Sequence, residues 1–251
     1  MPFLGEQPSR GLVGTADIDT NAIDGTLTKD ALVGDYSDVT ITAADLIMYG
    51  DATDSNNTKR DTVQGILDLG GGAWNIIGTS VASSSASLTI TGLDSTYDTY
   101  AIAISDIKVA TDTVMMQMTL GDSGGLDTGA SDYGWWHSQA VIDEDSQSSA
   151  ANIKSEDQAD SKISLTGDNN PIGNATSEGF SGMYWLNRPG DGAMMPTIHG
   201  TYHGTSNNVL GIGGLSFGIR KAVITLDRVS IFASSGNLTS GRLTVWGVAH
   251  A

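Results

Sequence analysis

The stretch SLTITGLDSTYDTYAIAISDIKV, residues 87–109, decides the fold class. In its first part the apolar residues Leu88 and Ile90 alternate with Ser and Thr, which is the two-residue period of a strand with one buried face. Its second part, 100–109, is apolar on both faces, and this pattern predicts a central strand that is covered on both sides. The stretch therefore predicts two consecutive β-strands.

The chain after Trp74 continues in the same manner. Short segments rich in Val, Ile, Leu, Met and aromatic residues are separated by turns of Gly, Ser, Asn and Asp, and no long amphipathic helix interrupts them. We expect further strands at 114–121, 180–188, 195–204, 214–219, 223–233 and 242–249. The pattern predicts an all-β protein with a β-sandwich of the jelly-roll-like type.

One of these segments, VITLDRVSIFA (223–233), changes phase. Its apolar residues stand at even positions from Ile224 and at odd positions from Val229. Because a shift of one residue turns a strand's other face inward, we expect a β-bulge near Asp227 and Arg228, or a passage of the strand between two sheets.

Residues 122–179 are rich in Ser, Asp and Gly, and they predict long loops or an excursion from the sheets. Loops of this length inside a compact domain are usually functional or protected by a neighbouring subunit. The segment contains SDYGWWHSQAV (131–141), an aromatic cluster in a chain of which aromatic residues make up only 6%.

The N-terminal part has a different pattern of apolar residues. Residues 1 to about 40 hold isolated apolar residues without a period, which predicts an extended arm. A short strand is expected at 45–49, a turn-rich loop follows it, and Asp61 or Thr62 can cap a short helix that ends at the glycines 70–72. We therefore divide the chain into an arm and collar, 1–72, and a β-sandwich head, 73–251.

Composition limits the function classes. The 251 residues include 29 acidic and 12 basic side chains, for a formal charge of −17, which argues against nucleic acid and anionic membranes as partners. There is no Cys, hence no disulfide, and no apolar run approaches the roughly 18 residues of a membrane span. No secretory leader is recognisable, so we expect synthesis in a cytoplasm without export by the usual route. Residues 189–251 are slightly basic, which suits contacts between copies of the chain, although chance placement of these charges on a solvated surface is an equal alternative.

Several segments resemble proteins of tailed bacteriophages. TAADLIMYGDATDSNNTKRDTVQGILDL (42–69) is similar to a segment near the start of many phage fibre proteins. SLTITGLDSTYDTYAIAISDIKVATDTVMMQMTLGDSGG (87–125), GASDYGWW (129–136) and SGNLTSGRLTVWGVA (235–249) resemble phage virion proteins, with Trp246 in place of the usual Tyr. The resemblance covers residues 40–251.

The resemblance implies a virion protein, assembled in the host cytoplasm. It implies a homotrimeric fibre or spike on the tail or head, docked on other virion proteins through its N-terminal region, with an exposed β domain that meets the host surface. A host-surface glycan is a further expected partner. It implies no catalytic residues. One alternative is a head decoration or cement protein that stabilises the capsid without binding a receptor, and a less favoured one is a polysaccharide depolymerase.

The aromatic residues are the candidates for contact with a receptor or a neighbouring subunit. Aromatic rings stack on the apolar faces of sugars and contribute large contact areas at interfaces. Since adjacent residues of a strand point to opposite faces, one of Trp135 and Trp136 should lie in the core and the other should face a neighbouring copy before any host molecule. The candidates are Tyr133, Trp135, Trp136, His137, Tyr184 and Trp185.

No metal, cofactor or catalytic site is predicted. HGTYH (199–203) reads as a strand, on which His199 and His203 would lie about 13 Å apart, too far to chelate one ion. Residues 51–57 and 167–170 offer oxygen ligands for calcium, but they lack the EF-hand spacing and fit ordinary turns better. The acids at 143–145 could form the carboxylate pair of a glycosidase, but a solvated surface is the favoured interpretation. We therefore expect no enzyme.

Overall fold

The computed structural model describes residues 40–69, 74–142, 153–167 and 170–249. The chain divides into two compact units, Met1–Ile66 and Leu67–Ala251. Strands make up most of the described residues, and the short helices lie only at 52–54 and 63–69.

The N-terminal unit contains an antiparallel hairpin of β1 (Leu46–Asp51) and β2 (Asn57–Thr62). A 3-10 helix, Ala52–Asp54, connects the two strands, and the Asp51 carboxylate caps it by accepting a hydrogen bond from Thr53 N at 2.9 Å. Lys59 pairs with Asp54 at 2.6 Å. The acidic side chains of this loop thus stabilise the turn, which is the interpretation that the sequence favoured over a calcium site.

The helix of this region, α1 (Val63–Leu69), begins where the sequence predicts it. The Thr62 hydroxyl accepts a hydrogen bond from Gly65 N at 3.0 Å, so Thr62 is the cap of the two candidates. The strand β2 was not predicted, because its sequence NTKRDT contains no apolar residue. It forms by backbone pairing with the apolar strand β1.

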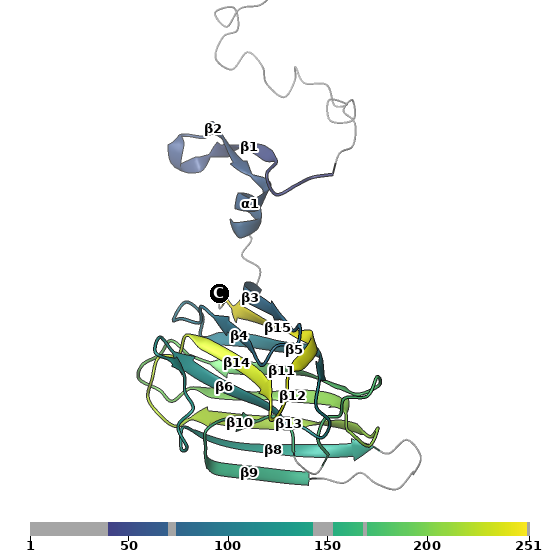
Figure 1. The fold of residues 1–251 in the computed structure, drawn as a ribbon. Coiled ribbons are helices and arrows are strands. Elements are labelled where there is room, and N and C mark those ends of the chain that lie inside the picture. The colour runs from purple at the N-terminus through teal and green to yellow at the C-terminus, as the bar shows by residue number, and fades with distance from the viewer. Residues whose placement is uncertain (1–39, 70–73, 143–152, 168–169, 250–251) are drawn as a thin grey trace, which may run out of the picture. The chain divides into compact units, whose positions relative to one another are not determined.

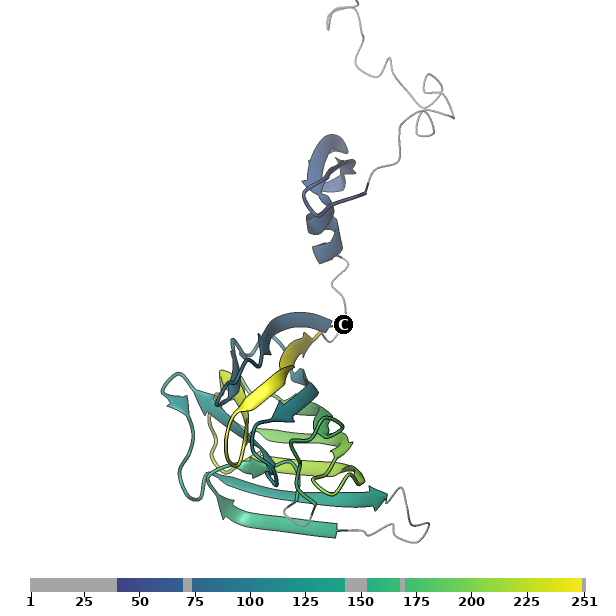
Figure 2. The same cartoon turned by 45° about the vertical axis from the view of Figure 1, so that its right-hand side comes forward.

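Two antiparallel sheets form the sandwich unit (Figures 1 and 2). The large sheet has eight strands in the order β3 (Trp74–Val81), β15 (Leu238–Val248), β5 (Thr99–Val109), β11 (Gly179–Asn187), β12 (Thr197–Thr205), β13 (Gly211–Arg220), β8 (Tyr133–Ile142) and β9 (Ile153–Asp160). The small sheet has five strands: β10 (Ile163–Ser164), β6 (Met116–Asp122), β14 (Arg228–Ala233) and β4 (Leu88–Thr91) in that order, with β7 (Gly125–Leu126) paired to β6. The all-β, sandwich-like fold predicted from the sequence is confirmed.

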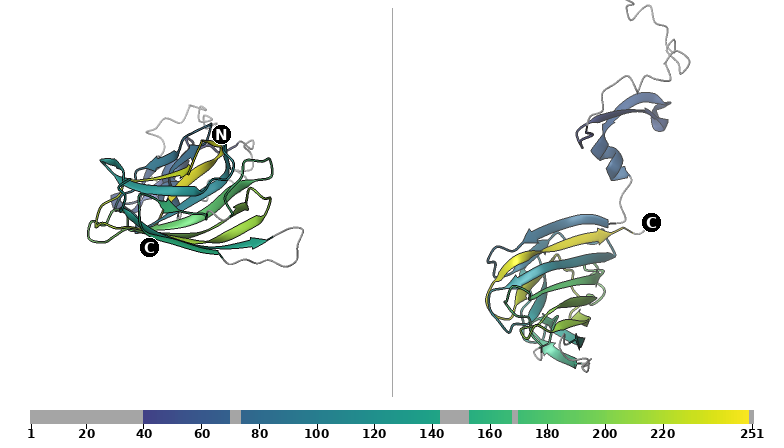
Figure 3. Two further views of the ribbon diagram at one scale, coloured as in Figure 1. Left: turned by 60° about the horizontal axis from the view of Figure 1, so that its bottom comes forward. Right: turned by 90° about the vertical axis from the view of Figure 1, so that its right-hand side faces the viewer.

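The small sheet lies against one face of the large sheet, and the core fills the space between them (Figures 1 and 3). Alternate residues of the facing strands supply it, as in β4, where Leu88 and Ile90 are buried and Thr89 and Thr91 are exposed. The largest side chains with almost no solvent contact are Tyr100, Tyr133, Tyr184 and Phe180. Tyrosine therefore contributes much of the core volume.

The prediction of long loops over 122–179 is wrong. The described part of this segment contains β7, β8, β9 and β10, and β8 pairs with β13 along ten residues. The inward positions of β8 include the buried polar side chains of His137 and Gln139. They conceal the apolar alternation that would have marked the strand.

The phase change in 223–233 coincides with the crossing from one sheet to the other. The strand β14 begins only at Arg228, and its pairing with β4 and β6 runs without a register shift. The residues before it are irregular, with Leu226 N donating to Pro189 O at 2.7 Å and Asp227 N donating to Gly121 O at 2.9 Å. No bulge occurs, but residues 221–227 pass from β13 of the large sheet to β14 of the small sheet, as the second alternative predicted. The two apolar phases belong to this connecting loop and to the strand that follows it.

Candidate binding face

The large sheet has an outer face, turned away from the small sheet, and a row of side chains crosses it. The register makes each of these residues the direct partner of the next, from the first strand of the sheet to the last. We call the following set the aromatic row: Ile76, Trp246, Ala101, Trp185, His199, Phe217, Trp136 and Glu156.

Tryptophans fill one end of the row. The ring of Trp74 on β3 lies edge-on to Trp185 at 5.5 Å and to Trp246 at 5.8 Å between centroids. Between Trp185 and Trp246 stands Ala101, which is fully buried although it is not part of the core cluster. The sequence predicted that β5 is covered on both sides. On the outer face the cover at Ala101 comes from the large side chains of Trp185 and Trp246 and not from a second layer of structure.

Trp136 dominates the other end of the row. This residue is 43% exposed, and its ring lies nearly parallel to that of Phe217, with 6.3 Å between centroids. A hollow of about 370 Å³ separates it from Trp185 and His199. A second hollow of about 530 Å³ lies on its β9 side, against Lys154 and Glu156. Trp136 thus stands between two depressions of the exposed surface.

The adjacent tryptophans point to opposite faces, as predicted. Trp135 is partly buried and packs against the core, its Nε1 donates to an Asp160 carboxylate oxygen at 3.1 Å, and its ring stacks on His137 at 5.6 Å. Burial raises the pKa of Asp160, but hydrogen bonds from Lys162 and Trp135 outweigh burial and hold this pKa below its ordinary value.

The structure separates the candidate contact residues into two groups. Trp136 and Trp185 lie on the outer face. Tyr133, His137 and Tyr184 are at most 1% exposed, so they are corrected from contact residues to interior residues. Their alternation with outward neighbours on β8 and β11 explains this outcome.

Tyr133, the first residue of β8, belongs to a buried polar cluster. Its hydroxyl accepts a hydrogen bond from Leu120 N at 2.9 Å and donates to Leu120 O at 2.8 Å. Burial raises the pKa of the Tyr133 hydroxyl, so the group stays neutral and keeps both roles. The side chain therefore joins β8 of the large sheet to β6 of the small sheet.

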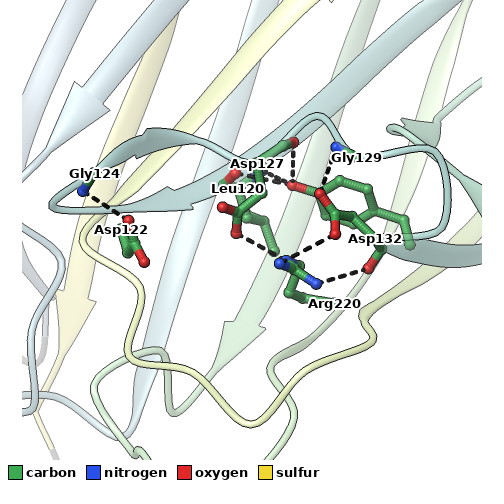
Figure 4. Close-up of polar contacts among 8 residues, drawn as sticks. Leu120, Asp122, Gly124, Asp127, Gly129, Asp132 and Arg220 are labelled. Carbon is green, nitrogen blue, oxygen red and sulfur yellow. Dashed lines mark hydrogen bonds and ion pairs between the residues drawn. The ribbon is translucent and has the colours of Figure 1, made fainter.

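Arg220 is the cation of the same cluster (Figure 4). Its Nε donates to the Asp127 carboxylate at 2.8 Å, an Nη lies 3.2 Å from Asp132 Oδ1, and its guanidinium lies 5.8 Å from the centre of the Tyr133 ring. Burial would lower the pKa of Arg220, but the hydrogen bond and charge of Asp127 outweigh burial and raise it. Arg220 thus fixes the connection from β7 to β8. Sequence reasoning missed this role, because it depends on which strand ends meet.

The remaining predictions about sites can be located in part. His199 and His203 both point outward from β12, on a strand as predicted. Among the described residues no group of three or more His, Asp or Glu side chains could hold a metal ion. The acids at 143–145 and residues 168–169 of the second calcium candidate lie outside the described residues. Neither of the helices described is long and apolar enough to cross a membrane.

Three comparisons were made with known proteins. No family of proteins, no curated protein and no solved structure matches this chain. The geometry of the outer face therefore carries the functional argument. Sequence reasoning missed Trp74 and Phe217 as parts of this face, since only the strand order brings them to it.

Proposed function

We propose that this chain is a bacteriophage virion protein, a homotrimeric fibre or spike. Residues 1–72 attach it to other virion proteins, and the sandwich binds the host surface. The aromatic row is the observation that carries the binding role, because exposed rings gathered on one sheet face are typical of contact sites. The resemblance of residues 42–69 and of the strand around Trp246 to phage proteins supports the virion assignment.

The N-terminal unit supports symmetric assembly. Leu46 and Met48 of β1 are 55% and 77% exposed, and Ile47 and Tyr49 on the opposite face of the hairpin are 43% and 44% exposed. An isolated two-stranded hairpin is marginally stable in water, so apolar side chains on both of its faces favour coverage by neighbouring copies. The acidic chain with a slightly basic last quarter fits such contacts as well.

The decisive experiment compares phage particles with and without the protein. Immunogold labelling should place the chain on a projecting fibre or spike, and particles without it should adsorb poorly to host cells. If they adsorb normally but release their genome on mild heating, the protein is a decoration protein and the proposal fails.

Two measurements on the purified full chain complete the test. Light scattering should give three times the chain mass of 26.0 kDa, and a stable monomer at micromolar concentration would contradict the trimer. Incubation with host capsule should release no oligosaccharide. Release of oligosaccharide would favour the depolymerase instead.

A further inference from the structure

We propose that the aromatic row binds an uncharged oligosaccharide, laid across the strands between Trp185 and Trp136. This inference rests on the proposed host-surface function, and it names the site and the ligand class. The C–H groups on one face of a pyranose carry partial positive charge and meet the negative face of an aromatic ring. Exposed, preordered rings supply such a surface at low entropic cost.

The spacing of the row fits more than one sugar unit. Trp185, Phe217 and Trp136 stand on β11, β13 and β8. The strand β12 lies between β11 and β13, and β8 pairs with β13. Three strand spacings of about 4.8 Å make a span of about 14 Å from the first ring to the last. A span of this length suits an oligosaccharide better than a single monosaccharide.

Polar groups stand beside the rings, where the hydroxyl groups of a sugar would need them. His199 is exposed and lies between Trp185 and Phe217 in the row. The hollow on the other side of Trp136 is lined by Ser138, Lys154, Ser155 and Glu156 as well. Trp136 therefore stands between an apolar hollow that His199 borders and a more polar hollow on the β9 side, and it can contact two successive sugar units.

The charge of the outer face favours an uncharged ligand. The chain carries a formal charge of −17, but the outward positions of β11, β12, β13 and β8 hold no Asp, Glu, Lys or Arg, and the neighbouring β9 adds Lys154 and Glu156, one charge of each sign. Recognition of phosphate or sulfate groups uses clusters of Arg or Lys, and a single Lys beside a Glu makes no such cluster. A neutral saccharide meets neither attraction nor repulsion here.

A second copy of the chain fits this part of the face less well. Apart from Leu215, which lines the hollow beside Trp136, the exposed aliphatic side chains that would anchor a protein interface stand at its margins, with Ile76 and Val81 on the edge strand β3 and Ile142 at the end of β8. The centre of the row instead places the polar His199 between the rings of Trp185 and Phe217. Contact between copies is therefore an outcome of the test and not part of the proposal.

The test uses the full chain and a panel of neutral hexasaccharides built from glucose, mannose, galactose, xylose or N-acetylglucosamine. Calorimetric titration should show binding of at least one of them, with a change in tryptophan fluorescence. Trp136→Ala and Trp185→Ala should each weaken that binding at least tenfold while circular dichroism stays unchanged. Ile142→Ala is the matched control, because Ile142 is 71% exposed on the same face but outside the row, and it should bind like the unaltered chain.

Three results would overturn the inference: no binding of any hexasaccharide at millimolar concentration, equal binding by the Trp136 and Trp185 variants, or dissociation of the oligomer by Trp136→Ala. None of these three results changes the outcome of the adsorption experiment, which tests the proposed host-attachment role separately. If instead the saccharide binds through the row but particles without the chain adsorb normally, the site stands and the proposed host-attachment role fails.

Discussion

Replacement of Arg220 by methionine tests how much the ion pairs of Arg220 contribute to the stability of the sandwich. The side chain of Arg220 is 10% exposed, and those of its partners Asp127 and Asp132 are 17% and 24% exposed. Methionine keeps much of the volume but leaves two carboxylates without their cation. Removal of one partner of a buried ion pair costs about 3–5 kcal/mol. Because both carboxylates keep some contact with water, we expect a loss of about 2–3 kcal/mol in the free energy of unfolding.

Thermal unfolding of the full chain, followed by circular dichroism, measures this loss. For a domain of this size about 1 kcal/mol shifts Tm by roughly 2–4 °C, so Tm of the sandwich should fall by about 4–12 °C. Arg188→Met is the matched control, because Arg188 also stands between two aspartates, each at 3.6 Å, but its side chain is 53% exposed. The control should lose less than about 1 kcal/mol.

Equal Tm values for the Arg220 and Arg188 variants would refute the reasoning, since burial would then give the Arg220 ion pairs no additional effect. A second check adds Asp127→Asn to Arg220→Met. The double variant should recover part of the loss, because one of the two uncompensated carboxylates is gone, and the coupling energy should exceed about 0.5 kcal/mol. Strictly additive losses would show that Arg220 and Asp127 act independently.

Three further changes are predicted. Tyr133→Phe should lower the free energy of unfolding in urea by about 1–3 kcal/mol, because Leu120 N loses its buried partner; an unchanged urea midpoint would contradict this. Burial raises the pKa of Tyr100 from 10.0 to about 12, so the stability that its retained proton contributes is complete below pH 10 and lost as the pH rises toward 12. The urea midpoint should therefore fall across that interval, and a constant midpoint would argue against the burial of this hydroxyl. Gly200→Ala would place a Cβ atom 2.2 Å from a backbone oxygen of β11, and it should destabilise the sandwich by about 1–3 kcal/mol or more. Gly211→Ala is the control, because its Cβ atom meets only ordinary contacts at 3.7 Å and should have little effect. Similar Tm values for the two glycine variants would speak against this crowding.

Strands with a clear apolar period could be predicted from the sequence. Leu88 and Ile90 mark β4, and the opposite orientation of Trp135 and Trp136 follows from strand geometry alone. The strand β8 escaped prediction because His137 and Gln139 occupy inward positions, where tertiary packing accommodates polar groups that no local pattern reveals.

The candidate binding face could be predicted only in part. Trp136 drew attention as a member of a conspicuous cluster, but its neighbour Phe217 stands far along the chain. Which residues share a row depends on strand order and register, and these are set by long-range pairing that a single sequence does not display. The same limit applies to Arg220, whose charge is visible in the sequence while its two carboxylate partners are not.

The pairing of β3 with β15 has a consequence for how this fold can be reused. Trp74, the first residue of the sandwich's first strand, is the direct partner of Val248, the last residue of its last strand. A domain whose two ends meet at one edge behaves as a cassette: it can be placed within a surface loop of another protein, or circularly permuted with a short linker, without a change in its sheets. The sandwich is therefore suited to exchange between carrier proteins as a single piece, with its broad outer face preserved in each new setting.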